Sequence, residues 1–189
     1  GPYGADTACE SQLGAVGSKH TAVEYLYDDY GNATRVTNLG DVADGADDTT
    51  VITEYAYNDT ENAYLVGYPN HVRVQDAQSN TVRENWTYYD GAADWTTAPT
   101  KGNPTKNEAW LNTGPNPVVT RTFDAYGNVE HEYDALWNAT GGAEGNHVQT
   151  SYDSTLHQYP TQVTNALSHA ESFTYDLGTG QALTRTDVN

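Results

Sequence analysis

The chain contains the stretch Tyr27-Asp28-Asp29-Tyr30-Gly31-Asn32, and the same pattern recurs as Phe123-Asp124-Ala125-Tyr126-Gly127-Asn128. In each stretch an aspartate follows an aromatic residue, and its carboxylate can accept a hydrogen bond from a backbone N–H two residues further on. The Gly-Asn pair supplies residues that tolerate the positive φ angle that a chain reversal requires. We therefore predict two equivalent turns, with Gly31 and Gly127 or the following Asn at positive φ.

Aromatic and polar residues alternate on both sides of these turns. Tyr25 and Tyr27 share one face of a predicted strand, while Glu24 points the other way. After the second turn, residues 129, 131 and 133 again share a face, with glutamates opposite. Each turn is therefore expected to join two strands of a hairpin with one buried and one solvated face. No long apolar period of about 3.6 residues is present, so we predict antiparallel β-structure with almost no helix.

Further steps from an aromatic residue to Asp or Asn continue the pattern at Tyr57-Asn58, Tyr89-Asp90, Tyr133-Asp134, Tyr152-Asp153 and Tyr175-Asp176. Their irregular spacing predicts strand-turn-strand units of variable loop length. Residues 41–50, 89–99 and 112–117 have the Gly, Pro, Asn and Asp content of such loops. We assign the repeat motif a structural role. Its residues are Tyr27, Asp28, Gly31, Asn32, Tyr57, Tyr89, Asp90, Phe123, Asp124, Gly127, Asn128, Tyr133, Asp134, Tyr152, Asp153, Tyr175 and Asp176.

The charge balance bears on the kinds of partner the chain can have. Of 189 residues, 8 are basic and 26 are acidic, which gives a formal net charge of −18. Such a chain repels phosphate backbones and anionic lipid surfaces, so we expect no nucleic-acid partner. No apolar run approaches the roughly 20 residues needed to cross a bilayer, so we expect no membrane span. The single cysteine, Cys9, cannot form an intrachain disulfide.

The two Tyr/Phe-Asp-x-Tyr-Gly-Asn stretches resemble the signature of Rhs/YD-repeat proteins. Residues 53–69, followed by Arg83-Glu-Asn-Trp-Thr-Tyr-Tyr-Asp90, are more similar to the shell-forming B component of insecticidal Tc toxin complexes. The resemblance covers residues 22–189. It implies a long β-sheet ribbon that spirals into a hollow shell around a toxic C-terminal polypeptide, with repeats that carry out no chemistry.

From this resemblance we expect an all-β fold of antiparallel strand-turn-strand YD repeats that form a curved sheet, part of a larger hollow β-shell. Residues 1–2 are expected to be a tag remnant, 3–21 an N-terminal lead-in, and 22–189 the repeat segment of a longer chain. The expected partners are neighbouring repeats and an enclosed toxin or effector polypeptide. The expected location is secreted or on a bacterial cell surface.

Side chains that could carry chemistry are scattered. We expect no enzyme activity, no catalytic residue, no cofactor and no metal site, because no metal-ligand spacing, nucleophile motif or phosphate-binding loop is present. On a strand, the glutamates of Glu130-His131-Glu132 face away from the histidine unless a bulge intervenes. Four aspartates in residues 41–48 predict a solvated loop, with calcium binding as the minor alternative. The histidines are His20, His71, His131, His147, His157 and His169.

A different class of function remains open, namely an extracellular module that binds glycans or a host surface protein. Such a module would leave two or three aromatic rings coplanar on the surface, whereas a shell wall would bury its repeat aromatics in rows. The rings concerned are those of Trp86, Trp95, Trp110 and Trp137, together with the tyrosines. Glycan-acceptor sequons begin at Asn32, Asn58, Asn85 and Asn138, and we expect Asn32 and Asn58 to serve the turns instead.

Overall fold

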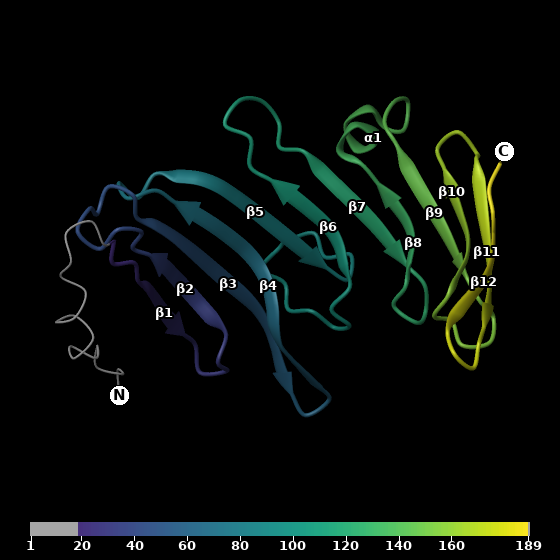
Figure 1. The fold of residues 1–189 in the computed structure, drawn as a ribbon, viewed down its shortest axis with the longest axis horizontal. Helices are drawn as coiled ribbons and strands as arrows, with labels where there is room; N and C mark the ends of the chain where they lie inside the picture. The colour runs from purple at the N-terminus through teal and green to yellow at the C-terminus, as the bar shows by residue number, and fades with distance from the viewer. Residues whose placement is uncertain (1–18, 189) are drawn as a thin grey trace. The chain divides into compact units, whose positions relative to one another are not determined.

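The computed structural model describes residues 19–188, so the expected tag remnant, residues 3–18 of the lead-in, and Cys9 lie outside the described residues. Strands follow one another in chain order, from purple β1 to yellow β12 (Figure 1). They are β1 (Val23–Tyr27), β2 (Ala33–Asn38), β3 (Thr49–Thr60), β4 (Ala63–Gln75), β5 (Thr81–Tyr89), β6 (Pro104–Ala109), β7 (Val118–Phe123), β8 (Val129–Tyr133), β9 (His147–Tyr152), β10 (Pro160–Asn165), β11 (Ala170–Asp176) and β12 (Gln181–Thr186).

The strands form one antiparallel sheet in which each strand pairs with the next, and the sheet does not close into a barrel. The predicted all-β fold is therefore confirmed. By their internal contacts, residues up to Glu54 with Val72–Glu84 form one compact unit, and Tyr55–His71 with Asn85 onward form a second.

In the first unit, β1 is exposed along its whole length. The rings of Tyr25 and Tyr27 stack on each other with centroids 6.0 Å apart and planes 13° apart, yet they are 52% and 61% exposed. The prediction that this aromatic face is buried is wrong. Among the described strands β1 pairs with β2 alone, and alternation within a strand does not provide a second layer to cover its rings.

In the second unit, burial concentrates where the connection from β5 to β6 folds over neighbouring strands. Tyr88 and Tyr89 are buried with Ala56, and Pro99 is fully buried. The Tyr89 hydroxyl donates to the Pro69 carbonyl over 2.8 Å. The connection is tied down by the side-chain amides of two strand asparagines, since Asn58 donates to the Pro99 carbonyl and Asn70 to the Trp95 carbonyl.

The registers reveal a β-bulge that the sequence did not predict. Leu26 pairs with Arg35 but Tyr27 pairs with Ala33, so Thr34 is an extra residue. The same two-against-one arrangement occurs beside the turn in the hairpins β5–β6, β7–β8, β9–β10 and β11–β12. A bulge adds local twist and redirects the strand as it leaves a turn. The extra residues are Thr34, Thr105, Glu130, Thr161 and Leu183.

One short helix, α1 (Ala135–Thr140), interrupts the connection from β8 to β9. It was not predicted, because six residues are too few to show a helical period. Asp134 caps it by accepting a hydrogen bond from Trp137 N–H, and Gly141 ends it with φ 62°. The Trp137 ring lies against Tyr133 and His147.

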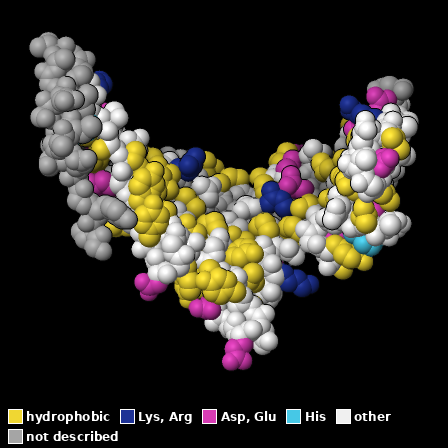
Figure 2. Space-filling view, turned by 60° about the horizontal axis from the view of Figure 1, so that its bottom comes forward, with side chains coloured by type: hydrophobic (Ala, Val, Ile, Leu, Met, Phe, Trp, Pro, Cys, Tyr) yellow, Lys and Arg dark blue, Asp and Glu magenta, His cyan; other side chains and the backbone are white. Residues whose placement is uncertain are grey.

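Apolar side chains remain at the surface on many strands and turns. Figure 2 shows them as separate yellow patches on the face viewed, with acidic side chains between them. Among them, Leu26 on β1 is 58% exposed and Leu183 on β12 is 62% exposed. The described sheet thus leaves much of its own apolar surface uncovered.

Candidate functional site

Within the described chain, an aspartate at the start of several hairpin turns accepts hydrogen bonds from the backbone of its own turn. Asp28 Oδ1 accepts hydrogen bonds from the N–H groups of Tyr30 (2.9 Å) and Asn32 (2.8 Å), and its Oδ2 accepts from Asn32 Nδ2 (2.9 Å). At the second turn Asp124 receives the same three bonds, from Tyr126 N–H, Asn128 N–H and Asn128 Nδ2. The two signature turns are therefore built alike.

The glycines of these turns have the predicted backbone. Gly31 has φ 86° and Gly127 has φ 89°. In both turns the glycine N–H donates to the aspartate carbonyl, and the aspartate N–H donates to the carbonyl of the closing asparagine. A residue with a Cβ is disfavoured in this left-handed region, so glycine is required by the turn rather than by packing.

In two longer connections an aspartate at the same position accepts a larger number of backbone N–H groups. Asp90 Oδ2 accepts from the N–H groups of Thr100, Lys101 and Gly102, and its Oδ1 accepts from Asn103 N–H. The buried Asp153 accepts four backbone N–H groups, those of residues 155, 156, 158 and 159. In both cases one side chain organises a whole connection. Asp176 begins the last hairpin in a similar way, accepting from the N–H groups of residues 178 and 179.

These hydrogen bonds favour the ionised carboxylates. Partial burial alone would raise the pKa of Asp90, but the N–H groups of Lys101, Gly102, Asn103 and Thr100 outweigh it and lower the pKa to about 2. For Asp153, hydrogen bonds from Tyr159 N–H and Leu156 N–H are the main reason that the pKa lies far below its usual range. The turn carboxylates are thus negative at neutral pH, and their oxygens are directed at the backbone.

Three of these hairpins have a threonine at the bulge. Thr34, Thr105 and Thr161 are extra residues at their bulges, and the hydroxyl of each donates to the carbonyl of the residue that precedes the turn aromatic, over 3.2–3.3 Å. A bulge disrupts the ladder locally. The threonine hydroxyl therefore adds a hydrogen bond across the strand pair at this point.

In the second unit, neighbouring turns also touch one another. The Tyr126 ring stacks on His157 with centroids 3.7 Å apart, and Asn128 Nδ2 donates to the His157 carbonyl over 2.7 Å. These contacts join the β7–β8 turn to the β9–β10 connection. Successive hairpins are therefore linked at their turns as well as through their strands.

Two turns of the same design were missed because they lack the aromatic residue and the glycine. Asp76 accepts from Gln78 N–H, Asn80 N–H and Asn80 Nδ2, and Asn165 accepts from the N–H groups of Leu167 and His169. Serine takes the place of glycine, with φ 65° at Ser79 and 61° at Ser168. A search for Asp or Asn followed at the third residue by Gly or Ser would have found both.

One predicted turn is wrong. Tyr57-Asn58 does not end a strand, because β3 continues to Thr60 and reverses after it. The Asn58 side-chain amide instead donates to the Pro99 carbonyl in the β5–β6 connection. Tyr133-Asp134 does end a strand, but Asp134 caps helix α1 and also accepts Asn146 N–H instead of closing a tight turn.

Four of the six histidines pack on aromatic rings. His71 stacks on Trp86 with a centroid distance of 5.5 Å, and His157 stacks on Tyr126 as described above. His131 stacks on Tyr133, and His147 lies against Trp137. Glu130 is a bulge residue, yet it and Glu132 are exposed while His131 is half-buried, so the triplet forms no common site. Among residues 19–188, no three His, Cys, Asp or Glu side chains form a group suited to a metal ion.

Three of the four sequon amides are used within the fold. Asn32 Nδ2 donates to Asp28, Asn58 Nδ2 to the Pro99 carbonyl, and Asn138 Nδ2 to the Val118 carbonyl. Asn85 lies within β5, opposite Ala109. The expectation of a turn role therefore holds for Asn32 and fails for Asn58.

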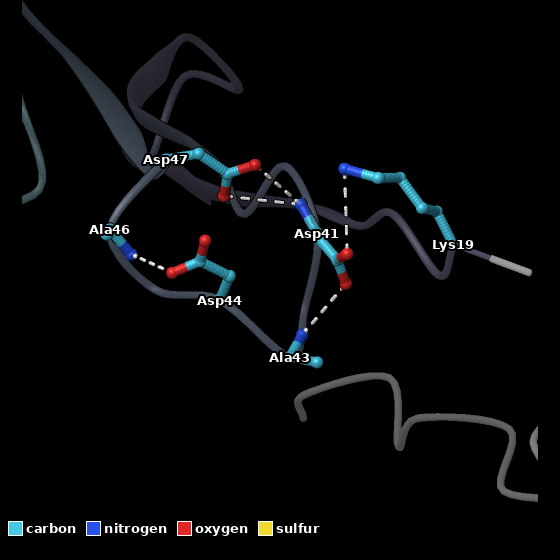
Figure 3. A network of polar contacts seen from close by, with 6 residues as sticks. All are labelled: Lys19, Asp41, Ala43, Asp44, Ala46 and Asp47. Atoms are coloured by element: carbon cyan, nitrogen blue, oxygen red, sulfur yellow. Dashed lines mark hydrogen bonds and ion pairs between the residues drawn. The ribbon is translucent and has the colours of Figure 1, made fainter. Parts of the chain in front are cut away.

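The acidic loop between β2 and β3 holds itself together. Asp47 accepts Asp41 N–H, Asp41 accepts Ala43 N–H and approaches Lys19 Nζ at 3.7 Å, and Asp44 accepts Ala46 N–H (Figure 3). These aspartates cap the backbone of their own loop, as in other polar turns. No helix within the described residues has the length and apolar character needed to span a bilayer.

Comparison with known proteins gives matches in structure only. No family model and no curated protein matches the sequence. The fold is similar to that in a crystal structure of TcdB2-TccC3-Cdc42, a Tc toxin, with 12% sequence identity over 85% of this chain and 11% of that chain and a TM-score of 0.34. A crystal structure of TcdB2-TccC3-TEV gives 12% identity over 87% and 10% of the two chains, with a TM-score of 0.29. The chain spans about a tenth of the length of these solved chains.

Proposed function

We propose that residues 22–189 are a wall segment of an Rhs/YD-type shell that encloses a toxin or effector polypeptide. The main support is the repetition of one hairpin design, in which an aspartate carboxylate closes the turn and a bulge follows it, along a sheet of linear strand order. Repeats of this kind contact their neighbours in sequence, so strands can be added without a change of design.

The exposed apolar side chains support the proposal that other polypeptide covers this segment. The buried core of the described residues is small, while large apolar side chains such as Leu26, Tyr64 and Leu183 are more than half exposed. Exposed apolar side chains on several strands are available for contact with another chain or segment. In a shell, that cover would come from adjoining repeats on one side and the enclosed polypeptide on the other.

The proposal includes the absence of catalysis and a location outside a bacterial cell, secreted or on its surface. The carboxylates that the repeat provides accept backbone N–H groups within their own turns, which is a structural use of an acidic residue. The arrangement of His71, His131, His147 and His157 on aromatic rings is likewise that of packing.

The alternative, an extracellular glycan- or cell-surface-binding module, is favoured by one observation. Tyr25 and Tyr27 present two exposed rings with nearly parallel planes, and exposed rings offer faces on which a sugar can stack. Against this, Trp86, Trp95 and Trp137 each pack on another ring of the fold. We therefore favour the wall.

Electron cryomicroscopy of the full-length protein that contains this segment tests the two functions. The wall predicts a further strand paired with β1 on the side opposite β2 and polypeptide against the exposed rings. A β1 edge open to solvent, together with saturable glycan binding that Tyr25→Ala abolishes, would overturn the wall in favour of the module.

A further inference from the structure

Two Asp-Gly pairs occur in the sequence, Asp44-Gly45 and Asp90-Gly91. In such a pair the glycine nitrogen can attack the aspartate side-chain carbon Cγ, because glycine has no Cβ to obstruct the approach. The reaction requires a backbone nitrogen free to act as nucleophile and a carboxyl group free to turn towards it. The surroundings of each pair therefore decide its reactivity.

Asp44-Gly45 is free in both respects. Both residues are exposed in the loop between β2 and β3, and the Asp44 carboxylate accepts one hydrogen bond, from Ala46 N–H over 3.1 Å (Figure 3). Within the part of the chain that the structure describes, Gly45 N–H has no hydrogen-bond acceptor. The space beside Gly45 is open, since a Cβ there would meet only Asp48 Oδ2, at 3.7 Å.

Asp90-Gly91 is restrained in both respects. The Asp90 carboxylate accepts four backbone N–H groups over 2.7–3.0 Å, which fixes its orientation within the β5–β6 connection. The Gly91 nitrogen donates its hydrogen to Thr105 Oγ1 over 2.8 Å. The four hydrogen bonds to the Asp90 carboxylate also lower its pKa to about 2. The protonated carboxyl group, from which water leaves readily, is therefore scarce.

We propose that Asp44 is a site of spontaneous conversion to isoaspartate and that the fold protects Asp90 from the same reaction. The Gly45 nitrogen forms a bond to Asp44 Cγ, and the carboxyl hydroxyl leaves with the nitrogen's proton as water, giving a five-membered succinimide. Water then adds to one of the two ring carbonyls. Cleavage of the bond between Cγ and nitrogen restores aspartate, and cleavage at the main-chain carbonyl gives isoaspartate, with no oxidant or reductant involved.

The product changes the loop. In isoaspartate the chain runs through the side-chain carbon, so the backbone gains one atom between residues 44 and 45 and the former main-chain carbonyl becomes a free carboxylate. In the unmodified loop Asp47 N–H donates to the Asp44 carbonyl, and the Asp47 carboxylate accepts Asp41 N–H. Isomerisation at Asp44 would therefore disturb the cap that orders the rest of the loop.

The test is to incubate the folded protein at mildly acidic pH and physiological temperature, digest it, and quantify isoaspartate in each peptide by mass spectrometry and by methylation with protein isoaspartate methyltransferase. We expect isoaspartate at residue 44 at least about tenfold faster than at residue 90, a barrier difference of about 1.4 kcal/mol. Equal rates at the two residues in the folded protein would overturn the proposal.

Two controls separate the fold from the dipeptide. In guanidinium chloride, where the restraints on Asp90 are absent, both residues should react at similar rates, whereas protection of Asp90 that persists in the unfolded chain would contradict a role for the fold. Gly45→Ala should fold like the parent, since its Cβ meets open space, and should suppress the reaction at residue 44. Undiminished isoaspartate in that variant would also refute the proposal.

Discussion

The turn aspartates act as acceptors for the backbone of their own turns. A chain reversal leaves several N–H groups without partners in the sheet, and one carboxylate with two oxygens can accept most of them. Asp90 is the clearest example, because it accepts N–H groups from four consecutive residues, 100–103. The repeat thus conserves backbone hydrogen bonding with a single side chain at each reversal.

Replacement of Asp90 by alanine is expected to lower the free energy of unfolding by about 2 kcal/mol, because hydrogen bonds to a charged group are lost and N–H groups are left unpaired. For a chain of this size the melting temperature should fall by about 4–8 °C. Asp90→Asn should lower the free energy of unfolding by less, since one acceptor oxygen remains. Asp29→Ala, at an exposed aspartate, is the matched control, and an equal effect of the Asp29 and Asp90 substitutions would contradict this role.

Gly127→Val is expected to destabilise by about 1–2 kcal/mol, because a residue with a Cβ is strained in the left-handed region. The nearest atom to the new Cβ is Asn103 Oδ1 at 3.8 Å, so the effect comes from the backbone and not from a clash. Gly45→Val, where φ is not positive, serves as the control in thermal denaturation. Equal melting temperatures for Gly127→Val and the parent would refute the turn geometry.

At the scale of the hairpin, the turn, the bulge and the strand pair form one unit. The aspartate closes the reversal and a bulge places an extra residue beside it. In three hairpins that residue is a threonine, which donates a hydrogen bond to the facing strand. Because the carboxylate must be ionised to accept several N–H groups at once, the stability of the hairpins depends on pH.

The turn aspartates should make folding sensitive to acid. In the folded protein the pKa values of five turn aspartates lie below the value of about 3.9 in an unfolded chain. They are Asp76, Asp90, Asp124, Asp153 and Asp176. The stabilisation is therefore complete above about pH 5 and is lost as the pH falls through 4 towards 2, the value to which the pKa of Asp90 is lowered. Denaturant midpoints measured at falling pH should decline over this window.

Acid also relieves repulsion within a chain of net charge −18, which acts in the opposite direction. The double variant Asp90→Asn, Asp153→Asn leaves most of this repulsion in place and removes two of the depressed carboxyl groups. Its midpoint should decline less steeply than that of the parent. Parallel declines in the two proteins would show that the turn carboxylates are not the cause.

The sequence predicts those hairpins whose turns are formed by a recognisable run of neighbouring residues. Gly31 and Gly127 were predictable because a positive φ angle favours glycine. The Asp76 and Asn165 turns were not predicted, because serine occupies the glycine position and the polar acceptor lacks a preceding aromatic residue. Helix α1 was too short to show a period, and the bulges depend on the register between two strands, which no single strand encodes.

Burial was the least predictable property. The alternation around Tyr25 and Tyr27 correctly describes a strand, but it cannot state whether another layer covers the aromatic face, and in the described residues that face is exposed. Conversely, the connection that contains the buried Pro99 is held by the amides of Asn58 and Asn70, which bond to the Pro99 and Trp95 carbonyls 41 and 25 residues further along the chain. A local pattern does not contain such contacts.

At the scale of the whole molecule, the sheet has two edge strands. Strands β1 and β12 each have one neighbour among the described strands, and every residue in both is exposed. Unpaired N–H and C=O groups on such edges pair with any available strand. In the proposed wall, adjoining repeats would meet this need, and in the isolated chain a second copy is the available partner.

Sedimentation velocity of the isolated chain, as salt rises from about 0.01 M to about 1 M, shows whether its edge strands are open to pairing. The charge of −18 opposes association, and its range falls from about 30 Å to about 3 Å over that series, while edge hydrogen bonds act at contact. A wall segment with open edges should be a monomer at low salt and form larger species as salt increases. A strict monomer at high protein concentration across the whole series would contradict a wall segment with open edges and would favour a self-contained binding module.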